Sequence, residues 1–197
     1  MRLAALLIYP TAVHLSIIMH APVIQIIAIA SLAAALLFNG LRKAGKFSWA
    51  IFLLIVALSI FAAYAEVAIY ALYVPPIIIP LLLWGVFFHS LLPGQEPIVT
   101  DLGEKARGPL TPEMRRYTRY VTISWMIMFA LIALWSAILP FIASDAVWSA
   151  FTNFINYAVV AASFFGEYLY RCIRFPEHNH PNFFQYLRIV INANIRK

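Results

Sequence analysis

Residues 67–92 read VAIYALYVPPIIIPLLLWGVFFHSLL, an apolar run without a single Asp, Glu, Lys or Arg. A helix needs roughly 20 apolar residues to cross about 30 Å of hydrocarbon, so this run is long enough to span a bilayer. The run is continuously apolar rather than alternating, which favours an α-helix over a barrel strand. This segment therefore predicts a transmembrane helix.

The composition of the whole chain agrees with that interpretation. Of the 197 residues, 63% are hydrophobic and 11% are charged, against about 45–50% and about 25% in soluble domains. This excess excludes a soluble fold, and the length leaves no room for a separate soluble catalytic module. A single cysteine, Cys172, excludes a disulfide framework and a Cys-rich metal site.

Six apolar runs of this kind predict an all-α, polytopic membrane protein with six transmembrane helices. They cover about residues 3–19, 23–38, 49–65, 67–92, 120–143 and 146–170. His20, Ala21 and Pro22 form a tight reversal between the first two. We expect a single six-helix transmembrane domain over residues 1–174, followed by a cytoplasmic tail over residues 175–197.

The distribution of positive charge predicts the orientation. Short loops rich in Lys and Arg stay in the cytoplasm. When Arg2 is placed inside and the loops alternate, all 14 Lys and Arg fall on the inner face. The three remaining connections, near His20, Glu66 and Asp145, contain neither Lys nor Arg. Both termini are therefore predicted to be cytoplasmic.

Two cytoplasmic segments are predicted to contain helices. The loop over residues 93–119 opens with a Pro-Gly turn and ends in a helix start, where Thr111 can cap and Pro112 suits the first helical position. That helix should continue without a break into the fifth span. In the tail, apolar residues from Phe183 onward recur at helical spacing, which predicts an amphipathic helix lying in the membrane interface.

Polar side chains inside a bilayer are costly, so each is a candidate functional group. His14 either donates a hydrogen bond to a neighbouring helix or handles protons or substrate. Glu66 either caps the outer end of the third span in contact with solvent or has a functional role. Glu167 precedes Arg171 by four residues, which favours a helical ion pair, and a binding role is the alternative.

The basic cluster Arg115, Arg116 and Arg119 is the strongest charge feature. It can hold the loop inside and contact anionic lipid headgroups, or it can bind the phosphate or carboxylate of a lipid-like substrate. Membrane lipids are the expected partners. Nucleic acid is excluded as a partner because no soluble domain presents the positive residues.

An enzymatic site at the cytoplasmic face is a further hypothesis. Its candidate groups are His89, Glu96, Asp101, Glu104 and Arg107. Two enzymatic patterns do not match. An acyltransferase pattern needs an Asp four residues after His89, where Pro93 stands. A pattern for phospho-alcohol transfer needs several further metal-binding aspartates, which the sequence lacks. His178 and His180 lack carboxylate or thiolate companions. The sequence therefore predicts no metal site and no cofactor.

Three prolines, Pro75, Pro76 and Pro80, should kink or break the fourth span because they remove backbone donors. Broken helices mark binding sites in many transporters. This keeps a small-substrate transporter among the open alternatives.

Three stretches resemble a family of small bacterial inner-membrane proteins. They are SLLPGQEPIVT (residues 90–100), GPLTPEMRRYTR (108–119) and GEYLYR (166–171). That family is associated with gene clusters for aryl polyene pigments and related fatty-acid-like products, and some members are labelled ketosynthases. The chain lacks the nucleophilic Cys with paired histidines that such an enzyme needs. The resemblance implies an accessory component of the bacterial inner membrane, near acyl-chain biosynthesis proteins at its cytoplasmic face.

Three functions therefore remain open from the sequence. The first is an accessory protein that scaffolds, or helps to translocate, a lipid-like or acyl/polyene product. The second is a membrane enzyme acting on a lipid or acyl substrate, and the third is a small-substrate transporter.

Overall fold

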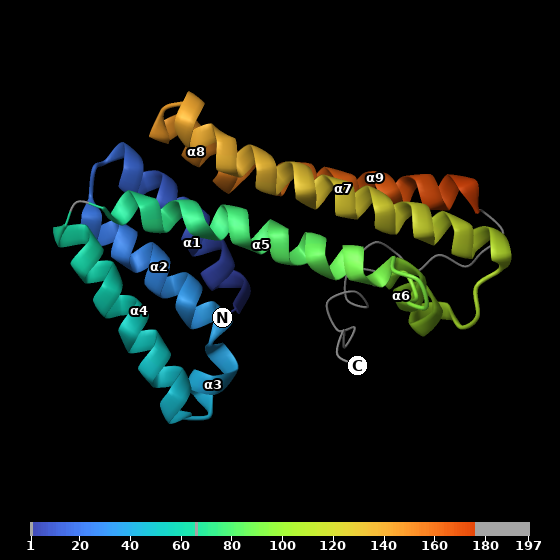
Figure 1. Ribbon diagram of the computed structural model, residues 1–197, viewed down its shortest axis with the longest axis horizontal. Helices are drawn as coiled ribbons and strands as arrows, with labels where there is room; N and C mark the ends of the chain where they lie inside the picture. The colour runs from blue at the N-terminus through green and yellow to red at the C-terminus, as the bar shows by residue number, and fades with distance from the viewer. Residues whose placement is uncertain (1, 66, 176–197) are drawn as a thin grey trace. The chain divides into compact units, whose positions relative to one another are not determined.

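The structure is a computed structural model that describes residues 2–65 and 67–175. Within these ranges the chain is helical with short turns and no strand, so the predicted all-α class is confirmed for this part. Glu66 and the predicted interfacial helix lie outside the described residues. The elements (Figure 1) are α1 (Arg2–Ile18), α2 (Pro22–Leu36), α3 (Phe38–Arg42), α4 (Lys46–Tyr64), α5 (Ala68–Ser90), α6 (Ile98–Arg107), α7 (Pro112–Ile142), α8 (Asp145–Ala150), the π-helical turn η1 (Phe151–Ile155) and α9 (Asn156–Arg174).

Four helical segments are long and apolar enough to cross a membrane, as in a multi-pass membrane protein. They correspond to the second, third, fourth and fifth predicted spans. The first and sixth predicted runs form α1 and the succession of α8, η1 and α9, and their membrane crossing remains a prediction. The four segments are Pro22–Arg42, Lys46–Tyr64, Ile69–Ser90 and Pro112–Ile142.

The chain divides into two compact units, which we describe separately. Unit 1 contains the residues up to Ile79 together with Ala133–Tyr157. Unit 2 contains Pro80–Ile132 together with the residues from Ala158 onward. The helices α5 and α7 each contribute one part to each unit. The single domain expected over residues 1–174 stays a prediction.

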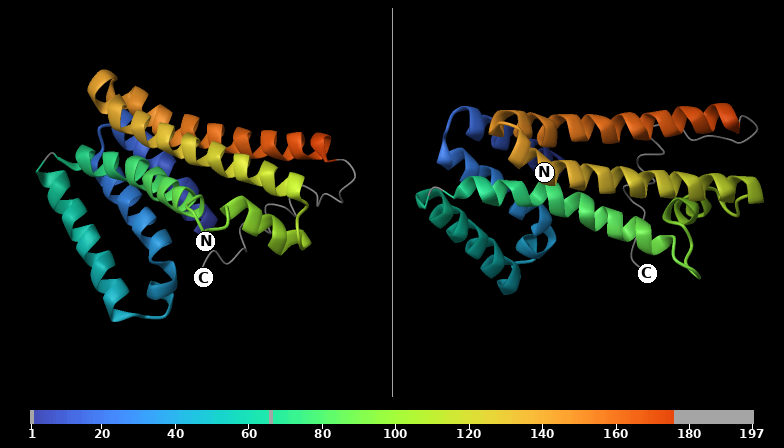
Figure 2. Two further views of the ribbon diagram at one scale, coloured as in Figure 1. Left: turned by 45° about the vertical axis from the view of Figure 1, so that its right-hand side comes forward. Right: turned by 45° about the horizontal axis from the view of Figure 1, so that its top comes forward.

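Unit 1 is built on a reversal that the sequence predicted. The helix α1 packs against α2, and α2 packs against α4; both views in Figure 2 show α2 leading through α3 into α4. His20 adopts a positive φ of 48° in the turn, and Ala21 is extended, as the residue before a proline should be. Pro22 then begins α2. The core of the unit contains the fully buried side chains of Val13, Ala28, Leu72 and Trp148.

The three prolines of α5 do not interrupt it. The sequence indicated a kink or a break, yet the helix runs without interruption from Ala68 to Ser90. The φ of a proline, near −65°, is compatible with a helix. Membrane helices also tolerate the missing donors. The predicted break does not occur, so α5 gives no broken-helix support to the transporter alternative, whereas the kink stays a prediction.

Side-chain hydrogen bonds to the backbone accompany the π-helical turn η1. The Thr152 hydroxyl donates to the carbonyl of Trp148 over 2.9 Å, and the Asn153 amide donates to the carbonyl of Ser149 over 3.0 Å. In this turn the backbone hydrogen bonds run from i to i−5, and the N–H of Asn156 bonds to the carbonyl of Phe151.

In unit 2 a turn leads from α5 towards α6. The N–H of Gln95 bonds to the carbonyl of Leu92 over 3.0 Å, with Pro93 and Gly94 at the centre of the turn. Gly94 has a φ of 81°, which this type of turn requires of its third residue. The Pro-Gly turn predicted at the start of the loop is therefore confirmed.

The start of α7 also agrees with the sequence. The N–H of Met114 donates to the Thr111 hydroxyl over 3.3 Å, which makes Thr111 the N-cap, and Pro112 is the first helical residue. From there α7 continues unbroken to Ile142, so the predicted continuation into the fifth span is confirmed.

The helix α6 was not foreseen. It docks on α7 through a hydrogen bond between the hydroxyls of Thr100 and Thr118, which are 2.7 Å apart and buried. The backbone N–H of Val99 also donates to the Thr122 hydroxyl over 3.4 Å. The loop that the sequence left without structure therefore contains a helix held against the first turns of α7.

Candidate functional site

Within unit 2, the first half of α7 and the second half of α9 lie side by side in antiparallel directions (Figures 1 and 2). At one end, Glu113 of α7 forms an ion pair with Arg174 of α9. One turn further along α7, Tyr117 stacks on Tyr170, with 5.7 Å between the ring centroids. Further still, the rings of Trp125 and Phe164 lie 4.6 Å apart. Aromatic side chains therefore bridge the two helices.

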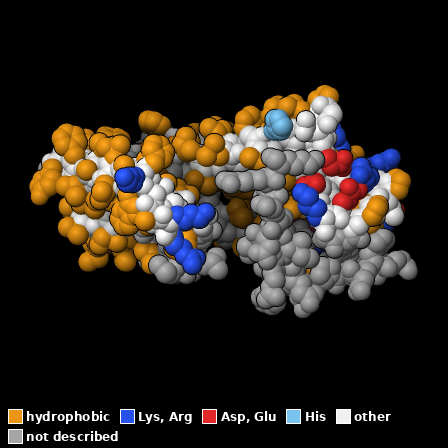
Figure 3. Space-filling model, turned by 90° about the horizontal axis from the view of Figure 1, so that it is seen from below, with side chains coloured by type: hydrophobic (Ala, Val, Ile, Leu, Met, Phe, Trp, Pro, Cys, Tyr) orange, Lys and Arg blue, Asp and Glu red, His pale blue; other side chains and the backbone are white. Residues whose placement is uncertain are grey.

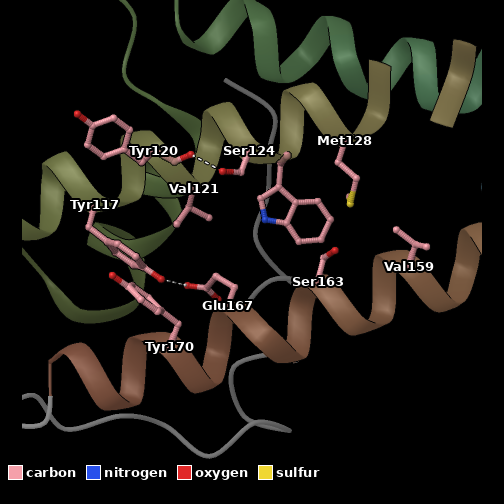
Figure 4. A pocket seen from close by; sticks show the side chains of 10 residues that line it. Tyr117, Tyr120, Val121, Ser124, Met128, Val159, Ser163, Glu167 and Tyr170 are labelled. Carbon is pink, nitrogen blue, oxygen red and sulfur yellow. Dashed lines mark hydrogen bonds between the residues drawn. The ribbon is translucent and has the colours of Figure 1, made fainter. Parts of the chain in front are cut away.

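A groove with a volume of about 480 Å³ lies between these helices. Its size falls within the range of about 300–1,000 Å³ found for small-molecule sites. Figure 4 shows Tyr117, Glu167 and Tyr170 at one end, with Met128 and Val159 further along. Glu167 is the single charged side chain among those that line the groove. The lining residues are Tyr117, Tyr120, Val121, Ser124, Trp125, Met128, Val159, Ser163, Glu167 and Tyr170.

At the polar end of the groove, Glu167 belongs to a nearly buried ion pair. The Glu167 side chain is 10% exposed and the Arg171 side chain 12%, and Oε1 of Glu167 lies 3.6 Å from Nε of Arg171. The Tyr117 hydroxyl donates to the same Oε1 over 3.2 Å. The spacing of four residues predicted this ion pair, whereas the hydrogen bond from Tyr117 was not predicted. Both side chains are nearly buried, so loss of either one would leave the other charge without this partner in a poorly solvated place.

The burial of the Glu167–Arg171 ion pair bears on the function of the groove. Burying an ion pair among apolar side chains is seldom a net gain in stability over well-packed hydrophobic residues. Ionisable groups in apolar helices therefore mark candidate binding sites. Glu167 meets this criterion, because it lines a groove as well as pairing with Arg171.

The candidate enzymatic carboxylates of the loop over residues 93–119 are held in ion pairs. Arg115 lies 2.5 Å from Glu104 and 3.3 Å from Glu96. Lys105 lies 2.6 Å from Asp101. Figure 3 shows red and blue side chains gathered together at this part of unit 2. The hydrogen bond and negative charge of Glu104, followed by the charge of Glu96, raise the pKa of Arg115 above its ordinary value, so the cation persists at any physiological pH.

The remaining members of the proposed enzymatic group do not join these carboxylates. His89 is exposed at the end of α5, and no contact between it and the three carboxylates occurs in the described part of the chain. Arg107 ends α6, and its side chain lies outside the described atoms. No group of three or more His, Cys, Asp or Glu among the described residues could hold a metal ion. His178 and His180 are outside the described residues.

The basic cluster is divided by these contacts. Arg115 faces the α6 carboxylates, whereas Arg116 and Arg119 are exposed and form no ion pair with any residue that the structure describes.

His14 lies in unit 1, in a polar cluster beside η1. Its Nδ1 is 3.2 Å from the hydroxyl of Ser149, and its ring packs edge-on against Phe154. The amide of Asn153 donates to the same hydroxyl over 3.2 Å. The hydrogen bond to a neighbouring helix, one of the two roles considered for His14, is thus present.

The aromatic wall of the groove was missed by sequence reasoning, although a signal exists. On α7 the lining positions Tyr117, Val121, Ser124 and Met128 follow one another at spacings of three or four, and on α9 Val159, Ser163 and Glu167 do the same. Such spacings place side chains on one helix face. Which two faces meet depends on the pairing of the helices, which the spacing does not specify.

No protein-family model, no curated protein and no solved structure matches this chain.

Proposed function

We propose that this chain is an accessory protein of the bacterial inner membrane that binds a lipid-like molecule in the groove between α7 and α9, and scaffolds it or helps to translocate it. The observation that carries the proposal is the groove itself: about 480 Å³ lined by aromatic and apolar side chains of two helices, with Glu167 at one end. An apolar pocket with a few convergent polar groups is the usual form of a ligand site.

The proposal includes six membrane crossings with both termini in the cytoplasm. The four long apolar helices supply four crossings. The apolar α1 and the continuous helical run of α8, η1 and α9, in which α9 alone has 19 residues, supply the other two. The positive-inside rule supports this orientation, because an arrangement with six crossings places every Lys and Arg on the cytoplasmic side.

The class of ligand is supported by the resemblance noted in the sequence. Residues 90–100, 108–119 and 166–171 resemble proteins associated with aryl polyene and fatty-acid-like products. The proposed ligand is accordingly an acyl or polyene product or a membrane lipid, and the proposed partners are acyl-chain biosynthesis proteins at the cytoplasmic face. The ion pairs that hold Glu96, Asp101 and Glu104 favour this role over the enzymatic alternative, because paired carboxylates are poorly placed to exchange protons with a substrate.

Photocrosslinking tests the proposal. The purified full-length chain in nanodiscs is labelled with a phospholipid that carries a diazirine in its acyl chain, and labelled peptides are identified by mass spectrometry. Ser163→Trp fills the groove, and Ile127→Trp adds the same side chain to an exposed position of α7 outside the groove lining. We expect labelling of groove peptides in the wild type and in Ile127→Trp and its loss in Ser163→Trp. Equal labelling in both variants would overturn the proposal.

A further inference from the structure

The walls of the groove combine several aromatic rings with one carboxylate. Tyr117, Tyr120, Trp125 and Tyr170 contribute the rings, and Glu167 contributes the charge. Aromatic faces attract cations, most strongly where water is excluded. A carboxylate with limited exposure adds a Coulomb attraction that solvent screens little. Both features are complementary to a positively charged nitrogen or phosphonium on an apolar body.

The charge that Glu167 now faces belongs to Arg171, whose guanidinium also lies over the Tyr168 ring, 5.8 Å from its centroid. Arg171 does not line the groove, and its Nε lies 3.6 Å from Oε1 of Glu167, longer than the 2.7–2.9 Å typical of a direct charge-assisted hydrogen bond. Arg171 is in the last turn of α9, where the helix dipole favours a cation. Its long side chain can extend towards the aqueous end of the helix. If a ligand cation took its place beside Glu167, Arg171 would keep its contact with the Tyr168 ring.

We propose that the groove between α7 and α9 is a site for a hydrophobic cation, whose positive charge takes the place of the Arg171 guanidinium beside Glu167 while its apolar body contacts Trp125 and Met128. This inference rests on the proposed function, since it needs the groove to be a ligand site. It narrows the acyl, polyene or lipid ligand of that proposal to a molecule whose apolar body carries a positively charged group.

The order of groups along the groove agrees with this assignment. Starting from the apolar end at Met128 and Val159, the first charged side chain is the carboxylate of Glu167, and the guanidinium groups of Arg171 and Arg174 follow further along α9. A molecule whose charged group is attached directly to its apolar body meets Glu167 first. An anionic molecule in the same position would meet a like charge.

Two ions of equal shape and opposite charge provide the probes: tetraphenylphosphonium and tetraphenylborate. Their binding to the full-length chain in uncharged detergent is measured by calorimetry, with Ser163→Trp as the blocked groove. We expect saturable binding of the cation, at least tenfold tighter than that of the anion, and no cation binding to Ser163→Trp. Equal affinity for the two ions, or unchanged binding to Ser163→Trp, would overturn the inference.

Two variants test the roles of the charged pair. Glu167→Gln keeps the shape and removes the charge, and we expect a loss of tenfold or more in cation affinity. Arg171→Gln removes the competing cation, and we expect affinity several-fold tighter than in the wild type. Weaker binding by Arg171→Gln would contradict the replacement of Arg171. Because Arg171→Gln and the comparison of ions in the wild type are independent of Glu167→Gln, failure of that variant to fold leaves the inference testable.

The same measurements separate this inference from the proposed function. If the acyl photoprobe labels the groove but tetraphenylphosphonium neither binds nor competes with it, the cation inference fails and the lipid site stands. If neither probe reaches the groove, both fail.

Discussion

The hydroxyl of Tyr117 on α7 donates a hydrogen bond to Oε1 of Glu167 on α9, across 50 positions of the sequence. This contact joins the two walls of the groove at its polar end. It also orients the carboxylate that the cation inference depends on.

Tyr117→Phe should weaken the association of α7 and α9. It removes one hydrogen bond to a carboxylate, and interhelical hydrogen bonds in membrane proteins contribute on the order of 1 kcal/mol. We expect a lower unfolding temperature in detergent by circular dichroism. Tyr120→Phe is the matched control, because Tyr120 also lines the groove but its hydroxyl has no partner among the described residues. The same shift in both variants would show that the contact with Glu167 contributes nothing.

Thr111→Ala should destabilise the first turn of α7 by about 1 kcal/mol, the usual cost of losing an N-cap side chain. The expected result is faster hydrogen exchange at the N–H of Met114, which now donates to the Thr111 hydroxyl. Thr111→Ser retains the capping oxygen and should exchange at the wild-type rate. Wild-type exchange in the alanine variant would argue against the cap.

Arg115→Gln should loosen α6. The change leaves Glu96 and Glu104 without the guanidinium that now contacts both. Since the Arg115 side chain is 46% exposed, we expect a small effect on global stability and a larger one on local proteolysis of α6. Arg116→Gln serves as the comparison, and α6 should be cleaved at the wild-type rate in that variant.

Replacement of Arg116 and Arg119 by Gln should reduce the binding of anionic lipid. Each arginine near the membrane surface contributes about 1 kcal/mol to such binding, and these two form no ion pair with any other described residue. Native mass spectrometry with phosphatidylglycerol measures the effect. The Arg115→Gln variant should lose less of its binding to anionic lipid, because Glu96 and Glu104 already offset the charge of Arg115. Equal losses for all three positions would contradict this division of the cluster.

The six-span arrangement predicts which positions can be labelled from outside the cell. In a Cys172→Ser background, a membrane-impermeant maleimide applied to the periplasmic side should modify Ala146→Cys and leave Lys43→Cys unmodified. A reporter protein that is active only in the cytoplasm should be active when it is fused at Lys197. Modification of Lys43→Cys in intact cells would contradict the proposed orientation.

Local features of the fold could be predicted from the sequence because neighbouring residues determine them. The reversal at His20, the turn at Gly94 and the cap at Thr111 each depend on backbone preferences within four residues. The ion pair of Glu167 and Arg171 belongs to the same group, because a spacing of four places both on one face of α9.

The groove could not be predicted in this way. Its polar end requires Tyr117 and Glu167 to meet, and nothing in the periodicity of α7 specifies α9 as its neighbour. The helix α6 was not predicted from the sequence for a related reason. Its hydroxyl contact between Thr100 and Thr118 forms only once α6 has docked on α7, and its sequence alone is polar enough to be taken for a loop.

The π-helical turn at Phe151–Ile155 has a consequence for how this chain tolerates changes in length. A π turn accommodates one residue more than an α-helical turn. Deleting one residue within it would let the segment wind as an ordinary α-helix, and the positions of α9 would keep their angular phase. A deletion inside α9 would instead rotate every later side chain by about 100°, carrying Glu167 away from Tyr117. A one-residue deletion between related chains would therefore do less harm to the groove in this turn than inside α9.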